Sequence, residues 1–281
     1  MNAAAPTRIR DALQAARRAG LDRLDAFALL EHVTQRSRTW LLAHDDELLP
    51  PNSGARYAVL VAQRADHVPL AYLVQEKEFH GLRLRVTPDV LVPRPDTETL
   101  VGWALELLPT AEPWRVADLG TGSGAIALAI RHERPLTQLI ATDASAAALE
   151  VARGNGAALG LSVDWRVGEW WDPLQGERFD LVVSNPPYIA QDDPHLSSLR
   201  HEPQRALTSG ADGLDDVRRI VEGSHRHLRS GGWLLLEHGF DQAQAVRDLL
   251  VHAGFAGVES RRDLAGHERC SGGRVRAALS A

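Results

Sequence analysis

Short runs of β-forming residues alternate with helical patterns through the C-terminal two-thirds of the chain, and this alternation constrains the fold more than any other feature. The runs are RVADL, TQLIATD, SVDWRV, FDLVVS, GGWLLLEHG and GRVRAAL. Strands that alternate with helices form crossovers between parallel neighbours. The sequence therefore predicts a doubly wound α/β fold, in which helices cover both faces of a mainly parallel sheet.

The N-terminal region has a different pattern, in which apolar residues recur with the 3.6-residue period of a helix. The apolar groups are Ile9, Leu13 and Ala16, then residues 26–33, then residues 57–62. This spacing predicts a small helical bundle domain over residues 1–73.

Between the two regions, apolar residues alternate with polar ones around a glycine, and three prolines exclude a long helix. The alternating residues are Phe79, Leu82, Leu84 and Val86. We predict a β-hairpin and linker over residues 74–95, followed by the α/β domain over residues 96–281. Asp96 or Thr97 can cap the first helix of that domain.

Composition narrows the classes of function. The 281-residue chain has 31 Lys and Arg against 37 Asp and Glu, a formal net charge of -6, so direct nucleic-acid binding is not expected. A lone cysteine, Cys270, forms neither an internal disulfide nor a metal cluster, which favours a cytoplasmic location. No apolar run is long enough to cross a membrane, and the histidines lack metal-ligand spacing, so neither membrane nor metal is expected. His225 and His227 are expected on a polar helix face.

A glycine-rich loop, DLGTGSG, lies where the first strand of the α/β domain should end, which is where open α/β sheets bind ligands. Glycine lets the backbone turn tightly and approach a ligand that a Cβ would exclude. Asp143, at the end of the next strand, can accept hydrogen bonds from ribose hydroxyls. The loop also satisfies a dinucleotide fingerprint, so nicotinamide or flavin binding stays open on this motif alone. The predicted cofactor-binding residues of the loop are Gly120, Thr121, Gly122, Ser123 and Gly124.

The tetrad Asn185-Pro186-Pro187-Tyr188 follows the strand FDLVVS. An amino nitrogen conjugated to a π-system is a poor nucleophile, but the Asn185 side-chain oxygen and the Pro186 carbonyl can each accept one of its hydrogens. The prolines hold that carbonyl in place, and Tyr188 offers a flat, electron-rich face. The tetrad predicts methyl transfer to such a nitrogen, with Asn185, Pro186 and Tyr188 as catalytic residues. An oxidoreductase is less favoured, because nothing nearby supplies an acid or base for hydride transfer.

Together these motifs resemble the S-adenosylmethionine-dependent N5-glutamine methyltransferases that modify peptide chain release factors. The resemblance covers nearly the whole chain, through PLAYLVQEKEFHGL, VTPDVLVPRPDTETLV, DLGTGSGAIALAI, SNPPYI, EPQRAL with GADGL, GGWLLLEHG and DLAGHER. The tetrad alone is shared with N6-adenine methyltransferases. The VPRPDTE segment resembles the release-factor branch more than the branch that modifies a ribosomal protein.

The resemblance implies a seven-stranded, Rossmann-like methyltransferase sheet, S-adenosyl-L-methionine as cofactor, S-adenosyl-L-homocysteine as product, and release factors as partners of the N-terminal domain. The methyl acceptor would be the glutamine of a Gly-Gly-Gln motif. Cofactor contacts would fall on residues 120–124, Asp143, Trp170 and Asn185. The substrate glutamine would lie against Asn185, Pro186, Pro187 and Tyr188. Trp171 is an alternative to Trp170 at the adenine, and Glu169 replaces the usual aspartate.

Other functions fit part of the pattern: N5-glutamine methylation of a ribosomal protein, N6-adenine methylation of nucleic acid, and cofactor binding without catalysis. The net charge and the lack of a target-recognition insert count against nucleic acid. In PRPDTE, Arg94, Asp96 and Glu98 can close over the site or form a rigid linker into the helix. Glu237 and His238 end an apolar strand, where a structural role for the carboxylate is at least as well supported as a catalytic one.

Overall fold

The computed structural model describes residues 7–276, which divide into one compact unit up to Glu76 and a second from Lys77. The first unit is a helical bundle, as the spacing of its apolar residues predicts. Its helices are α1 (Ile9–Arg18), α2 (Arg23–Thr34), α3 (Arg38–Ala43), α4 (Ser53–Ala65) and α5 (Leu70–Val74).

The bundle has its own apolar core, in which Leu29 and Leu30 of α2 are fully buried. The Tyr57 hydroxyl donates a hydrogen bond to the Ala26 carbonyl at 3.0 Å, which joins α4 to α2. Ala12 is buried beside Ile9 and Ala16, whereas Leu13, expected on that face, is only partly buried at its edge.

The second unit begins with a hairpin of β1 (Glu76–Phe79) and β2 (Leu82–Arg85), whose apolar residues Phe79, Leu82 and Leu84 pack into the core of this unit. It continues through η1 (Pro95–Thr97), α6 (Glu98–Leu107), β3 (Arg115–Leu119), α7 (Ala125–Glu133), β4 (Gln138–Asp143), α8 (Ala146–Leu159), β5 (Asp164–Val167), η2 (Asp172–Leu174) and β6 (Phe179–Ser184). The remaining elements are η3 (Pro194–Leu199), η4 (Gln204–Ala206), α9 (Asp215–His227), β7 (Leu228–Glu237), α10 (Ala243–His252), β8 (Ala256–Arg262) and β9 (Glu268–Arg274).

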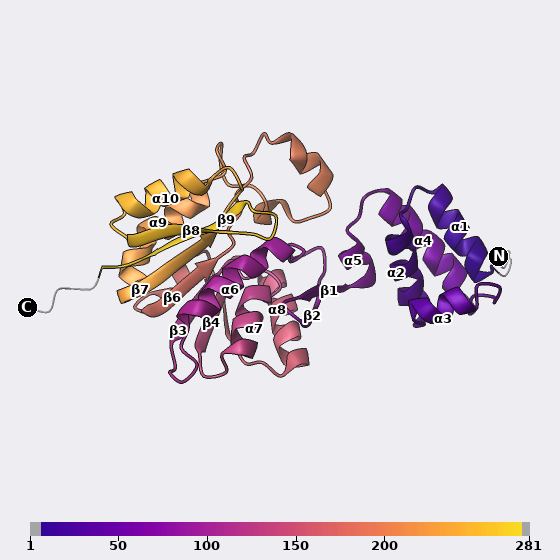
Figure 1. Cartoon of the computed structure of the whole chain (residues 1–281), viewed down its shortest axis with the longest axis horizontal. Coiled ribbons are helices and arrows are strands. Elements are labelled where there is room, and N and C mark those ends of the chain that lie inside the picture. The colour runs from indigo at the N-terminus through magenta and orange to yellow at the C-terminus, as the bar shows by residue number, and fades with distance from the viewer. Residues whose placement is uncertain (1–6, 277–281) are drawn as a thin grey trace, which may run out of the picture. The chain divides into compact units, whose positions relative to one another are not determined.

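Seven strands form one sheet in the order β5-β4-β3-β6-β7-β9-β8. The first five are mutually parallel, and β9 runs antiparallel to both of its neighbours. Neighbouring residues of a strand face opposite sides, so Val183 joins the core beneath α6 and α7 while Val182 joins the core beneath α9 and α10. Figure 1 shows α6, α7 and α8 over one face and α9 and α10 over the other. The predicted doubly wound, mainly parallel seven-stranded fold is confirmed.

Two predictions at the C-terminal end were wrong. The last strand covers Glu268–Arg274, not residues 273–279, of which residues 277–279 lie outside the described chain; β8 was not predicted at all. Gly272 and Gly273 give β9 a poor strand pattern, but a Cβ on Gly272 would lie 2.5 Å from Leu235 Cδ2. Close packing against β7 therefore requires a residue that sequence propensity disfavours.

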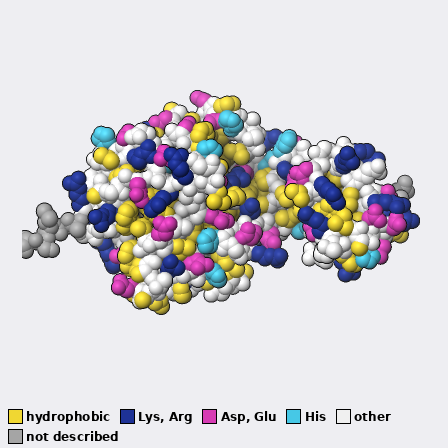
Figure 2. Space-filling view, viewed as in Figure 1, with side chains coloured by type: hydrophobic (Ala, Val, Ile, Leu, Met, Phe, Trp, Pro, Cys, Tyr) yellow, Lys and Arg dark blue, Asp and Glu magenta, His cyan; other side chains and the backbone are white. Residues whose placement is uncertain are grey.

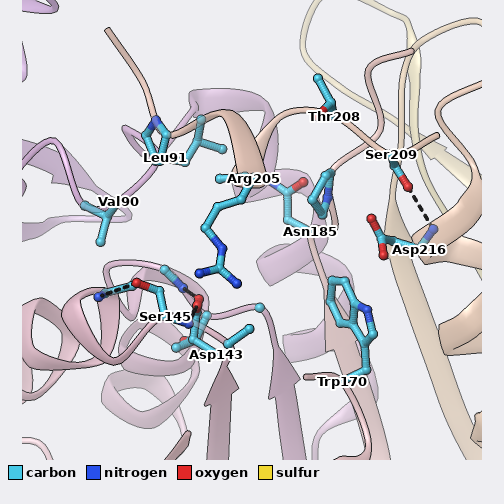
Figure 3. Close-up of a pocket in the computed structure, with 18 of the residues that line it drawn as sticks. Val90, Leu91, Asp143, Ser145, Trp170, Asn185, Arg205, Thr208, Ser209 and Asp216 are labelled. Carbon is cyan, nitrogen blue, oxygen red and sulfur yellow. Dashed lines mark hydrogen bonds between the residues drawn. The ribbon is translucent and has the colours of Figure 1, made fainter. Parts of the chain in front are cut away.

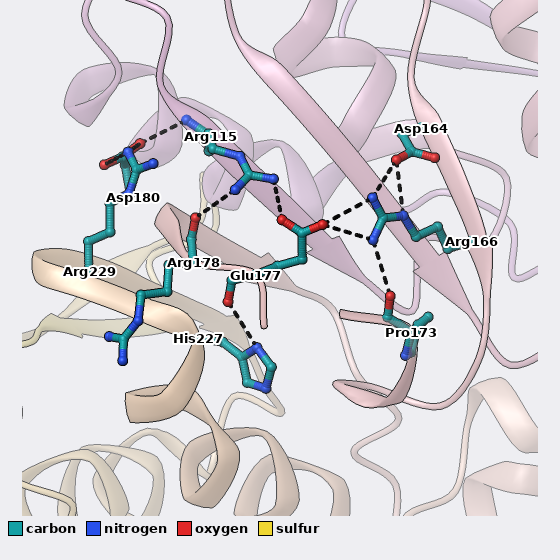
Figure 4. A network of polar contacts seen from close by, with 9 residues as sticks. All are labelled: Arg115, Asp164, Arg166, Pro173, Glu177, Arg178, Asp180, His227 and Arg229. Carbon is teal, nitrogen blue, oxygen red and sulfur yellow. Dashed lines mark hydrogen bonds and ion pairs between the residues drawn. The ribbon is translucent and has the colours of Figure 1, made fainter. Parts of the chain in front are cut away.

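An ion-pair network ties together the amino ends of the parallel strands (Figure 4). Glu177 accepts from Arg115 at the start of β3 at 2.5 Å and from Arg166 of β5 at 3.3 Å. Asp180 of β6 accepts from the Arg115 backbone and from Arg229 of β7, both at 2.8 Å. This edge is thus filled with charge pairs, and the opposite edge is left for a ligand.

No helix in residues 7–276 combines the length and apolar character needed to cross a bilayer.

Candidate active site

A cavity of about 440 Å³ opens at the carboxyl ends of β3, β4 and β6 (Figure 3). Because these strands are parallel, the loop after β3, Asp143 at the end of β4 and Asn185 after β6 reach the same edge of the sheet. Most of the predicted site residues lie at this edge, where the motifs indicate ligand binding.

The glycine loop has the backbone conformation that its sequence predicts. Gly120 has φ of +71° and Gly122 has φ of +54°, in the left-handed region that side chains disfavour. A Cβ on Gly122 would meet nothing within 4 Å, since this residue faces open space, whereas one on Gly120 would lie 3.2 Å from Trp170 Cζ3. Thr121 and Ser123 also line the cavity, although both are nearly buried. Gly124 is not among the described lining residues and instead begins α7, against Trp165.

Two aspartates support this loop: Asp118, which is fully buried, and Asp143, which is half-buried. The Thr121 hydroxyl donates to Asp118 Oδ2 at 2.6 Å, and burial raises the pKa of Asp118 to about 7. Asp143 accepts from the Gly122 N–H at 2.9 Å and from the Ser145 N–H at 2.8 Å. Burial raises the pKa of Asp143 as well, against the smaller opposing effects of these two hydrogen bonds and of Arg205. Asp143 therefore orders the loop while one side of it borders the cavity.

The two adjacent tryptophans have different surroundings. Trp170 lines the cavity, has φ of +45°, and its buried Nε1 has no hydrogen-bond partner in residues 7–276. A strained backbone and an unpaired donor are features that folds retain at functional positions. Trp171 is core: it is 8% exposed, donates to the Ile220 carbonyl at 3.1 Å and stacks on His227 with ring centroids 4.8 Å apart. His227 is therefore buried, and its expected place on a polar face was wrong.

Two residues of the tetrad line the cavity and two do not. Asn185 and Pro187 line the cavity, whereas Pro186 and Tyr188 do not appear in its described wall. Tyr188 is half-buried, and burial, followed by the charge of Glu237, raises the pKa of its hydroxyl. Gln242 donates to the Tyr188 carbonyl at 3.0 Å, which fixes the end of the tetrad.

Thr97 lies next to the tetrad and is also the N-cap residue of α6. Of the two residues predicted to cap α6, Thr97 occupies the N-cap position, but its side chain makes no capping hydrogen bond. Instead Asn185 Nδ2 donates to Thr97 Oγ1 at 3.2 Å. Thr97 is 4% exposed, so this contact is shielded from water.

The PRPDTE segment is held by two ion pairs and one hydrogen bond to three separate parts of the unit. Arg94 lines the cavity and pairs with buried Glu202, which also accepts from the Val92 N–H at 3.2 Å. Asp96 pairs with Arg269 at 3.1 Å, and Glu98 accepts from the His80 N–H at 3.1 Å. Only Arg94 of these acidic and basic groups reaches the described cavity wall, so the segment serves mainly as a fixed linker into α6.

Several cavity residues were missed by the sequence argument. Figure 3 shows the Arg205 side chain extending into the cavity toward Asp143, and Thr208, Ser209 and Asp216 on another wall. Asp216 N–H donates to Ser209 Oγ at 2.8 Å, which joins this loop to the start of α9. EPQRAL and GADGL were noticed as motifs, but only the fold brings them to the cavity.

Within the part of the chain that the structure describes, no three His, Cys, Asp or Glu side chains are grouped to hold a metal.

The fold and the cavity define a methyltransferase of the doubly wound α/β class. A family model described as the methyltransferase small domain matches residues 103–251, and one described as the PrmC N-terminal domain matches residues 5–74. The chain belongs to the release factor glutamine methyltransferase family.

That membership rests on relatives with this name. The one from Xylella fastidiosa strain Temecula1 is 52% identical over 94% of this chain and 97% of its own, and the one from Escherichia coli K12 is 42% identical over 95% and 97%. Among solved structures, the T. thermophilus 16S rRNA N2 G1207 methyltransferase, in complex with AdoMet and guanosine, is similar with a TM-score of 0.55 at 18% identity, over 72% of this chain and 50% of its own. At that identity the likeness supports the fold alone.

Proposed function

We propose that this chain transfers a methyl group from S-adenosyl-L-methionine to the N5 nitrogen of the glutamine in the Gly-Gly-Gln motif of peptide chain release factors. The observation that carries the proposal is the placement of Asn185 on the wall of the same cavity as the glycine loop and Asp143. The names of the relatives, release factor glutamine methyltransferase, supply the substrate class.

The cavity fits the proposed cofactor. Its volume of about 440 Å³ lies in the range of about 300 to 1,000 Å³ typical of small-molecule sites. Gly122, which lines the cavity, has no side chain to occupy the open space beside it, and Asp143 can accept hydrogen bonds from ribose hydroxyls. Trp170, with its strained backbone, offers an aromatic face for the adenine. A structural relative solved with AdoMet has the same fold.

When bound, S-adenosyl-L-methionine supplies an electrophilic methyl group on its sulfonium. The protein must then orient the weakly nucleophilic amide nitrogen and raise its electron density. Asn185 Oδ1, on the cavity wall, accepts one hydrogen of the glutamine amide. We assign the second hydrogen to the Pro186 carbonyl and the stabilisation of developing positive charge to Tyr188, although neither residue is in the described wall of the cavity. No strong base is needed, since the methylated nitrogen is very acidic before it loses its proton. Positioning and electrostatics therefore account for most of the rate.

The division of labour between the two units is also a proposal. We assign recognition of the release factor to the bundle of residues 1–73, the hairpin and linker to residues 74–95, and methyl transfer to residues 96–281. We place the enzyme in the cytoplasm, where release factors work. On the face in Figure 2 basic and acidic side chains are interspersed, which agrees with a protein partner rather than a nucleic acid.

The test is transfer of a tritiated methyl group to three acceptors: a release factor, a large-subunit ribosomal protein and DNA. We expect label in the release factor alone. Asn185→Ala should lower turnover by about 10²-fold or more, because a hydrogen-bond acceptor for the amide is lost, while the protein stays folded. Cofactor binding by the wild-type chain without label in any acceptor would support a cofactor-binding module, and label in DNA would support the adenine methyltransferase alternative. Equal labelling by wild type and Asn185→Ala would contradict the role assigned to Asn185.

A further inference from the structure

A buried carboxylate lies behind Asn185 and has no part in the chemistry described above. Glu237, the last residue of β7, is fully buried, and neither of its oxygens has a hydrogen-bond partner of ordinary geometry in residues 7–276. A group of this kind costs free energy, because water is removed and little replaces it. The presence of this carboxylate in the folded chain, despite its cost, therefore indicates a functional role for Glu237.

The neighbours of Glu237 are residues of the active site. The Thr97 hydroxyl and the Asn185 amide lie close enough to lower its pKa, the second and last of the contributions to it. Asn185 Nδ2 donates to Thr97 Oγ1 at 3.2 Å. Since this oxygen already accepts from Asn185, its own proton is available to Glu237.

We propose that Glu237 and Thr97 are positioning residues that determine which end of the Asn185 side-chain amide faces the cavity. The ionised carboxylate accepts a hydrogen bond from the Thr97 hydroxyl, Thr97 Oγ1 accepts one from Asn185 Nδ2, and Oδ1 is left to face the methyl acceptor. The reverse orientation would set the donors of Asn185 against those of the acceptor amino group. The inference rests on the proposed function, because it assumes an acceptor with an NH2 group.

Glu237 acts through Asn185 rather than on the substrate, because it is absent from the described lining of the cavity. The charged groups that face it come from two other elements: Arg269 of β9, which favours its ionised form, and Asp96 of η1, which opposes it. Burial raises the pKa values of Tyr188 and Cys270, and the charge of Glu237 raises both of them further. Arg269 pairs with Asp96 at 3.1 Å, so its effect on Glu237 is partly offset.

The arrangement has a pH dependence of defined sign. Burial raises the pKa of Glu237 to about 7. Below that pH the carboxyl is protonated and donates to Thr97, whose hydroxyl can then turn to Asn185 Oδ1 and favour the unproductive orientation. Turnover should therefore rise with pH through about 7. The contribution of Glu237 to the free energy of unfolding should fall as the pH rises toward about 7, because the unfolded chain ionises this group at a lower pH than the folded chain does.

The experiment compares wild type with Thr97→Val, Thr97→Ser and Glu237→Gln on a release factor, with kcat, KM and cofactor Kd measured from pH 6 to pH 9. Thr97→Val should lower kcat about tenfold, which is the loss of one oriented hydrogen bond, with KM and cofactor Kd nearly unchanged. Thr97→Ser, which restores the hydroxyl, should recover most of the activity. Thr137→Val is the matched control, because Thr137 is equally buried but lies just before β4, at the other edge of the sheet.

Glu237→Gln keeps an acceptor for Thr97 at every pH. We expect its kcat to lose the rise near pH 7 and its thermal midpoint at pH 8 to equal or exceed that of wild type. A purely structural carboxylate would instead give a less stable variant with the wild-type pH profile, and that result would overturn the proposal. So would a Thr97→Val enzyme as fast as wild type. Failure of wild type to methylate the release factor would contradict the proposed function itself, which is a separate outcome.

Discussion

Burial sets the chemistry of single residues at the carboxyl edge of the sheet. Asp118, Asp143 and Glu237 are carboxylates with raised pKa values, and burial is the largest cause for each. Each nevertheless has a specific neighbour: Thr121 for Asp118, the Gly122 N–H for Asp143, and the Thr97–Asn185 pair for Glu237. These three carboxyl groups therefore hold neighbouring residues of the site in place. None of them is needed as a base in the proposed reaction.

Trp170 and Trp171 give a prediction at the same scale. Trp170→Ala should weaken S-adenosyl-L-methionine binding about tenfold with little loss of stability, because Trp170 packs on Gly120 at the cavity wall. Trp171→Ala should lower the free energy of unfolding by about 3 to 5 kcal/mol, because Trp171 fills the core beneath α9. Calorimetric titration and urea unfolding of both variants check this. The reverse assignment of effects would show that Trp171 faces the cofactor.

At the residue scale, sequence patterns could predict groups whose chemistry is local. Asn185, Asp143 and two of the loop glycines, Gly120 and Gly122, reach the cavity because strand ends determine their positions. Arg205 could not be predicted, since it comes from a long segment between β6 and α9 whose path depends on tertiary contacts such as the Arg94–Glu202 pair, and Asp216 lies at the start of α9, the helix that follows this segment. The capping pattern predicts the place of Thr97 at the start of α6, but not that its hydroxyl oxygen accepts a hydrogen bond from Asn185, 88 positions away in the sequence.

At the scale of the elements, charged residues have different roles at the amino ends and at the carboxyl ends of the parallel strands. The amino edge is closed by pairs around Glu177 and Asp180, and the carboxyl edge leaves a cavity. The strands themselves could be predicted wherever an apolar run was buried on both faces, as in β3 and β6. β8 could not, because most of its residues are exposed or half-exposed and its partner β9 is rich in glycine.

The network at the amino edge predicts a pH effect on stability. The hydrogen bond from Arg115 is the largest of the influences that lower the pKa of Glu177. A depressed carboxyl pKa adds stability above the unfolded value, and this is lost as the pH falls through the folded value. Glu177→Gln should therefore cost about 1 kcal/mol or less at pH 7, because the partners are partly exposed, and the difference should vanish in acid. Urea unfolding at several pH values measures this, and a constant difference down to acid pH would contradict it.

At the scale of the whole molecule, the chain comprises two units with separate cores. Composition and periodicity predicted the helical bundle and the α/β fold, because each unit satisfies its own hydrophobic pattern. The hairpin of β1 and β2 was expected within a linker segment, and its buried residues pack into the core of the second unit. The sequence does not reveal which core a short hairpin joins, since this depends on the shape of the neighbouring surface.

Separate cores predict separable stability. Leu30 is fully buried in the bundle, so Leu30→Ala should destabilise it by about 2 to 5 kcal/mol. Hydrogen exchange should show faster exchange in α1, α2 and α4, while S-adenosyl-L-methionine affinity stays at the wild-type value. Methylation of the release factor should fall through a raised KM if the bundle recognises it. An equal loss of cofactor affinity would show that the two units do not fold independently.

The central claim is that the glutamine of a Gly-Gly-Gln motif receives the methyl group. Its most direct test is peptide mass spectrometry of a release factor after incubation with this enzyme and S-adenosyl-L-methionine. We predict that one methyl group is added to the peptide with this motif and that fragmentation places it on the glutamine side chain. An unmodified glutamine, under conditions in which calorimetry shows the cofactor bound, would contradict the account.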